Sequence, residues 1–72
     1  MSAPASNNGQ VNTEFAEAIR DACVQAALDA YEHARMDGLC HEGAWEVAVG
    51  AMQRLNVARV LEKVEKHRRQ QP

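Results

Sequence analysis

Residues 35–42, RMDGLCHE, hold the turn that decides the fold. Gly38 is the residue type that closes a helix in the left-handed conformation, and Leu39 supplies the apolar contact that accompanies a Schellman motif. A first helix is therefore expected to end at about Asp37. A second should begin near His41 or Glu42, because an acidic side chain is favourable in a first turn. Two helices joined by so short a connection form a helical hairpin.

The segment upstream of this turn has the apolar period of an amphipathic helix. At about 100° per residue one face carries Phe15, Ile19, Ala22, Cys23, Ala26, Ala30 and Ala34, and acidic side chains lie opposite. Asn12 is a favoured N-cap residue, so the helix is expected to span Thr13–Asp37. Residues 1–11, which are mostly small and polar, are expected to form a disordered N-terminal tail.

Downstream of the turn the apolar pattern changes phase at Asn56. Up to that point Ala44, Trp45, Ala48, Ala51, Met52 and Leu55 share one face. The apolar residues that follow, Val57, Val60, Leu61 and Val64, would point about 180° away from that face if the helix ran straight through. Asn56 is a favoured N-cap, and Leu55 and Val60 stand at the two positions of a hydrophobic staple. We therefore predict a break and a third helix from Val57 to about Lys66; the alternative is one continuous helix.

The predicted fold is all-α: a helical hairpin plus a short third helix, within residues 12–66, followed by a basic C-terminal tail at 67–72. No stretch of the chain shows the alternating pattern of a strand. The 72 residues include thirteen alanines, which favour helix but contribute little apolar area. Because so small a bundle buries little surface, we expect dimerisation or a partner chain to complete it.

The two cysteines are expected to stay unpaired. The helix between Cys23 and the turn rises about 21 Å. Because the Cα atoms of bridged cysteines lie within about 7 Å of each other, Cys23 is too far from Cys40 to form a disulfide. Free thiols fit a reducing compartment. No apolar run approaches the roughly 18 residues of a membrane span, and the first ten residues do not resemble a signal peptide. We therefore expect a cytoplasmic protein with no membrane association.

Charge is distributed unevenly along the chain, whose net charge is −2. Residues 1–56 carry −5 and residues 57–72 carry +3. This asymmetry favours an antiparallel or cross-subunit arrangement over binding to a polyanion. Weak nucleic-acid binding through Lys63, Lys66, Arg68 and Arg69 is an alternative. It is disfavoured because no aromatic side chains are interleaved with these cations and no helix-turn-helix spacing is evident.

Side chains capable of chemistry gather at the turn. Cys40 and His41 are candidate metal ligands, and His33 lies about one turn before the first helix ends. A zinc site normally has four ligands with paired spacings, so the simpler interpretation is a turn that packs the corner. A metal- or redox-responsive switch is the alternative. Motifs for phosphate binding, dinucleotide binding or paired-carboxylate catalysis are absent from the sequence. We therefore expect no enzyme, no cofactor and no small-molecule substrate.

Apolar side chains outside the main face of the first helix point to a protein partner. Val24, Leu28 and Tyr31 widen the apolar arc beyond what one neighbouring helix would cover, unless the third helix folds over them. Trp45 is expected to be the central packing residue, so that its removal should unfold the domain; its alternative role is an interface anchor. The predicted partner-binding residues are Val24, Leu28, Tyr31, Trp45 and Met52.

Residues 38–55, GLCHEGAWEVAVGAMQRL, resemble the core of short uncharacterised helical proteins of proteobacteria, with a similarity that covers roughly Ala22–Asn56. The resemblance implies a compact helical domain and brings no activity, ligand or partner with it. The small alanine-rich core and the stripe of Val24, Leu28 and Tyr31 indicate the expected function, a small helical protein-interaction module. It would act as an accessory or regulatory subunit of a larger enzyme, or as a homodimer.

Overall fold

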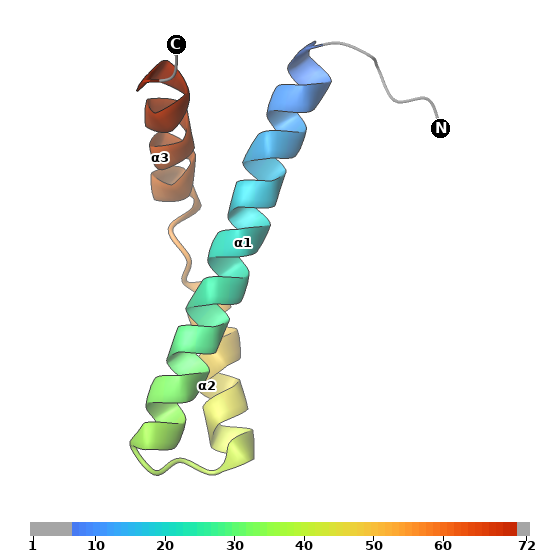
Figure 1. The fold of residues 1–72 in the computed structure, drawn as a ribbon. Helices are drawn as coiled ribbons and strands as arrows, with labels where there is room; N and C mark the ends of the chain where they lie inside the picture. Colours follow the sequence, from blue (N-terminus) through green and yellow to red (C-terminus); the bar gives the residue numbers. More distant parts are fainter. Residues whose placement is uncertain (1–6, 71–72) are drawn as a thin grey trace, which may run out of the picture.

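The computed structural model describes residues 7–70 and places three helices there, α1 (Asn7–Met36), α2 (His41–Gln53) and α3 (Val57–Gln70). Both shorter helices run roughly antiparallel to α1 (Figure 1). α2 lies along the C-terminal half of α1, and α3 lies beside its N-terminal half. Residues 7–70 contain no strand. The predicted all-α fold, a helical hairpin followed by a third helix, is confirmed.

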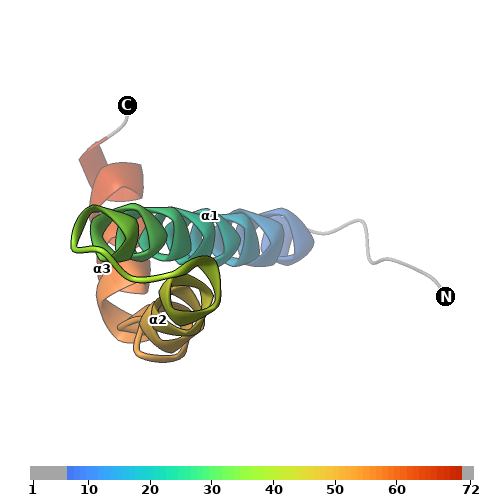
Figure 2. The same ribbon diagram turned by 90° about the horizontal axis from the view of Figure 1, so that it is seen from below.

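The molecule is long and thin for its size. Its extents are 48 × 34 × 16 Å and its radius of gyration is 16.0 Å, whereas a compact domain of this length has a radius of about 11 Å. Figure 2 shows α2 nearly end-on beside α1, with α3 set at an angle to it. Within the described residues α3 packs on α1 and not on α2. Each short helix therefore uses a separate stretch of α1, and no single core joins all three.

The connection between α1 and α2 is a Schellman motif. The Leu39 N–H donates to the Ala34 carbonyl at 3.0 Å, and the Gly38 N–H donates to the Arg35 carbonyl at 3.0 Å. These are the two bonds that define the motif, and Gly38 takes the left-handed conformation with φ = 96°. Cys40 is then the N-cap of α2, since its Sγ accepts the Gly43 N–H at 3.4 Å. The predicted end of one helix and start of the next are both confirmed.

The second connection lies where the apolar pattern changes phase. α2 ends at Gln53, and Asn56 caps α3: its Oδ1 accepts the Arg59 N–H at 3.0 Å, and its carbonyl accepts the Val60 N–H at 3.2 Å. This is the capping geometry for which asparagine is favoured. The break at Leu55–Asn56 is confirmed, and the alternative of one continuous helix is wrong.

Both outer helix boundaries lie beyond the predicted ones. α1 begins at Asn7 and not at Thr13, so residues 7–11 of the predicted tail are helical, while residues 1–6 lie outside the described part. Asn12 is inside the helix because a cap worth about 1 kcal/mol does not stop a helix that has no proline to break it. α3 continues past Lys66 to Gln70. The extension is supported by the Arg68–Glu14 ion pair and by basic side chains in its last turn, which favour a helix C-terminus.

The core between α1 and α2 is built from alanine. Ala34, Ala44 and Ala48 are the buried apolar residues of the described part, and α3 contains none. Alanines at a helix crossing let the two backbones approach closely, but they contribute little buried apolar area. The hairpin is therefore tightly spaced and weakly stabilised.

None of the three helices is long and apolar enough to span a membrane, within the residues that the structure describes.

Candidate protein-interaction surface

Large apolar side chains lie on the surface of the hairpin. Val24 is 51% exposed, Leu28 is 53% exposed and Trp45 is 56% exposed. The expectation that Trp45 is the central packing residue is wrong. The physical reason is the close approach of the helices: alanines at the crossing leave no room for an indole, so the ring lies at the rim. This position is compatible with the alternative role, an anchor for a partner.

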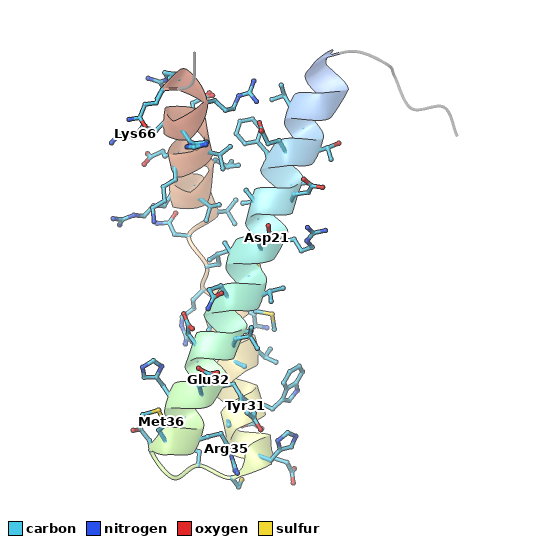
Figure 3. All side chains as sticks on the ribbon, in the orientation of Figure 1. Asp21, Tyr31, Glu32, Arg35, Met36 and Lys66 are labelled. Carbon is cyan, nitrogen blue, oxygen red and sulfur yellow. The ribbon has the colours of Figure 1, made fainter. Side chains whose placement is uncertain are left out.

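Tyr31 and His41 join the two helices on the side where these residues lie. The Tyr31 hydroxyl Oη and His41 Nδ1 are 2.5 Å apart and share a hydrogen bond. The two rings meet edge to face, with centroids 5.6 Å apart and planes at 76°. Tyr31 points from α1 toward α2 in Figure 3, whereas Met36 lies on the other side of α1. This contact fixes which flank of α1 adjoins which flank of α2.

The Tyr31–His41 contact therefore places the predicted residues together. Leu28 and Val24 precede Tyr31 by one and two turns along α1, on the same flank. Trp45 follows His41 by one turn along α2, and because the helices are antiparallel it lies level with Leu28. Met52 lies two turns farther along α2 and is half-buried. We call this set the hairpin face: Val24, Leu28, Tyr31, His41, Trp45 and Met52.

The third helix leaves the hairpin face uncovered. It packs on the N-terminal half of α1, where Arg68 pairs with Glu14. An open groove of about 450 Å³ separates the two helices there and is lined by Phe15, Ala58, Leu61, Glu62 and Glu65. Val24 and Leu28 remain more than half exposed beyond it. The alternative in which the third helix folds over the Val24–Leu28–Tyr31 stripe is wrong.

The residues at the turn do not converge on a metal site. His33 turns back onto its own helix, where its Nδ1–H donates to the Asp29 carbonyl at 2.7 Å. His41 bonds to Tyr31, and Cys40 caps α2. No group of three His, Cys, Asp or Glu side chains in residues 7–70 could hold a metal ion. The alternative site made of His33, Cys40 and His41 is therefore not formed. Cys23 and Cys40 are both free thiols.

The basic side chains of α3 are interleaved with acidic ones. Arg68 pairs with Glu14 of α1. Lys63 and Lys66 line a shallow recess of about 190 Å³ together with Arg59 and Glu62. Nucleic-acid sites present an uninterrupted stripe of cations. In α3, Glu62 and Glu65 stand among the first cations, and only the last turn lacks acidic residues. The geometry thus gives no support to the nucleic-acid alternative.

Two members of this region were not predicted from the sequence as surface residues. The sequence marks His41 as a residue of the corner and a candidate metal ligand, and its spacing of four residues from Trp45 places both on one flank of a helix. Arg35 was not considered; its Nη1 donates to the Leu39 carbonyl at 3.1 Å, which holds the guanidinium at the end of the hairpin face. Met36 is 81% exposed on the other side of α1, and nothing in the structure explains its position.

Comparisons of the chain with protein-family models, with curated proteins and with solved structures find no match, so the hairpin face is interpreted from its own residues.

Proposed function

We propose that the protein is a helical protein-interaction module that binds a protein partner through the hairpin face. The observation that carries the proposal is the exposure of Trp45, Leu28 and Val24 on one side of the hairpin. Trp and Tyr are enriched among residues that dominate binding energy, because they bury a large area at little cost in conformational entropy. A partner with an apolar helical surface matches this face.

The weakness of the internal core supports the same proposal. Only three alanines are buried among the described residues, and the radius of gyration exceeds that of a compact domain. A chain with so little internal burial gains stability when a partner binds its folded state, since binding shifts the folding equilibrium. The proposed role is that of a homodimer or of an accessory subunit of a larger enzyme, without catalytic activity of its own.

We further propose a cytoplasmic location. Cys40 is exposed and Cys23 is half-buried, and both are free. Exposed thiols of this kind persist in a reducing compartment, where glutathione and thioredoxin keep them from oxidising.

Site-specific photocrosslinking in the native host tests the interaction module. A photoreactive phenylalanine derivative replaces Trp45 in one variant and Val47 in the other. Val47 is a matched control, because it is also an exposed apolar residue of α2 but lies about 200° around the helix from Trp45. We expect a covalent protein adduct from position 45 and none from position 47. Absence of an adduct from position 45, or equal adducts from both positions, would contradict the proposal.

A further inference from the structure

The hairpin face continues along α1 as a regular seam. Six residues of α1 follow one another at alternating spacings of four and three: Glu17, Asp21, Val24, Leu28, Tyr31 and Arg35. All are exposed except Tyr31, which is half-buried. Alternation of three and four is the spacing by which two helices pack along each other. We call these six residues the α1 seam.

The charges of the α1 seam have an order along the helix. Glu17 and Asp21 lie at its N-terminal end and Arg35 at its C-terminal end, with the apolar residues between them. Glu17 and Arg35 are each nine residues from position 26, or about 13.5 Å along the axis. Val24 and Leu28 are also equally spaced about position 26. A surface with opposite charges at equal distances from its centre is complementary to itself when one copy is reversed.

We infer that the partner at the hairpin face is a second copy of this chain, bound antiparallel with α1 against α1 about a twofold axis near residue 26. This inference rests on the proposed function. In this register Val24 packs against the partner's Leu28, and Glu17 lies opposite the partner's Arg35. The remaining seam pair is Asp21 opposite the partner's Tyr31. All three pairs occur twice by symmetry, as in any interface that uses the same patch on both subunits.

Other arrangements of two copies are less complementary. A parallel pair would place Glu17 against Glu17 and Arg35 against Arg35, which is repulsive. An antiparallel pair shifted by one turn would set Leu28 against the partner's Arg20, and the opposite shift would set Val24 against the partner's Glu32. Either shift also removes the pairing of opposite charges, because Glu17 then lies opposite the partner's Tyr31 or the partner's Leu39. The register centred on residue 26 is therefore the one that pairs Glu17 with Arg35.

The rest of the hairpin supports this arrangement. The bond from Arg35 Nη1 to the Leu39 carbonyl holds the guanidinium at the end of the seam, which lowers the entropy lost when it meets a carboxylate. Trp45 lies level with Leu28 on the adjoining flank of α2 and adds an aromatic side chain beside the α1 seam. One helix pair alone buries little area, and the second helix of each hairpin enlarges the interface.

Charge reversal with rescue tests the register. Sedimentation equilibrium of the full chain measures the dimer dissociation constant for wild type, Glu17→Arg, Arg35→Glu and the double variant. We expect wild type to dimerise. Each single variant should weaken the dimer by about tenfold, because two exposed pairs change from attraction to repulsion. The double variant should restore association. Asp29→Arg is the control: it changes the net charge as Glu17→Arg does but lies about 120° away from the seam, and its dimer should match wild type.

Circular dichroism accompanies each measurement, since Arg35→Glu places an acidic side chain in the last turn of α1 and removes the bond to Leu39. Glu17→Arg changes neither the last turn of α1 nor the bond to Leu39. That variant therefore decides the inference even if Arg35→Glu fails to fold. An unaltered dimer in Glu17→Arg would overturn the proposed register. If wild type stays monomeric while position 45 still crosslinks to another protein, the partner is not a second copy of this chain, but the proposed interaction module is still supported. If wild type stays monomeric and position 45 gives no crosslink, both proposals are refuted.

Discussion

Replacing Trp45 by alanine separates a structural role of this side chain from a binding role. Truncation of a fully buried aromatic residue costs about 3–5 kcal/mol, which is comparable to the whole stability of a domain this small. The Trp45 side chain is 56% exposed, so a little under half of it is buried. Scaling the cost by that fraction gives roughly 1.5–2 kcal/mol. We therefore expect Trp45→Ala to remain predominantly folded and to lose its partner.

Two measurements test this expectation together. Urea unfolding followed by far-ultraviolet circular dichroism gives the free energy of unfolding, and sedimentation gives association. Trp45→Ala should keep the helical spectrum in the absence of urea and should dissociate. Val47→Ala is the control, because it removes exposed apolar atoms from another side of α2 and should leave association unchanged. An unfolded Trp45→Ala protein would refute the reasoning, since it would mean that the indole supports the core. A folded variant that associates like wild type would remove Trp45 from the interface.

Three further substitutions test the connections and the core. Gly38→Ala should destabilise the hairpin by about 1–2 kcal/mol in a urea unfolding experiment, because a residue with a Cβ is strained at φ = 96° even where the Cβ meets no atom within 4 Å. An unchanged free energy of unfolding would contradict the Schellman closure. Asn56→Ala should cost about 1 kcal/mol and lower the helix content by fraying the start of α3, as the Oδ1 bond to Arg59 is lost; an intact α3 by NMR chemical shifts would show that the cap is dispensable. Ala44→Leu should cost about 1–3 kcal/mol, because Ala44 is 0% exposed and the helices must separate to admit a larger side chain; a thermal midpoint at or above that of wild type would show that the crossing has spare room.

The turns could be predicted because their causes are local. Gly38 favours the left-handed conformation through the absence of a Cβ, and Asn56 caps a helix through its own side-chain oxygen. Neither effect depends on what the rest of the chain does. The phase change at Asn56 added independent support, since a straight helix would have placed the apolar residues before and after Asn56 on opposite faces. Residue-level predictions of this kind fixed three helices and both connections.

The position of Trp45 could not be predicted because it depends on how closely two helices approach. The helical period assigns Trp45 to the same broad face as Ala44 and Ala48, but it does not distinguish the centre of that face from its edge. Alanines at the centre bring the backbones together and leave the indole at the edge. The extent of α3 was missed for a related reason: the Arg68–Glu14 pair joins residues far apart in sequence, and neither residue signals it alone. The start of α1 was missed because a favoured N-cap residue such as Asn12 also occurs inside a helix.

The attachment of α3 has a consequence for local unfolding. None of the residues of α3 is buried, and within the described part of the chain α3 contacts only α1. The opening of α3 therefore leaves the alanine crossing of the hairpin undisturbed. Proteins open in cooperative units whose free energies follow the apolar contacts that each unit makes. The hairpin and α3 are therefore two such units, and α3 is the one of lower free energy. When α3 opens, the segment of α1 around Phe15 loses its cover while the hairpin face keeps its shape, so local unfolding at one end of α1 leaves the exposed apolar residues of the other end in place.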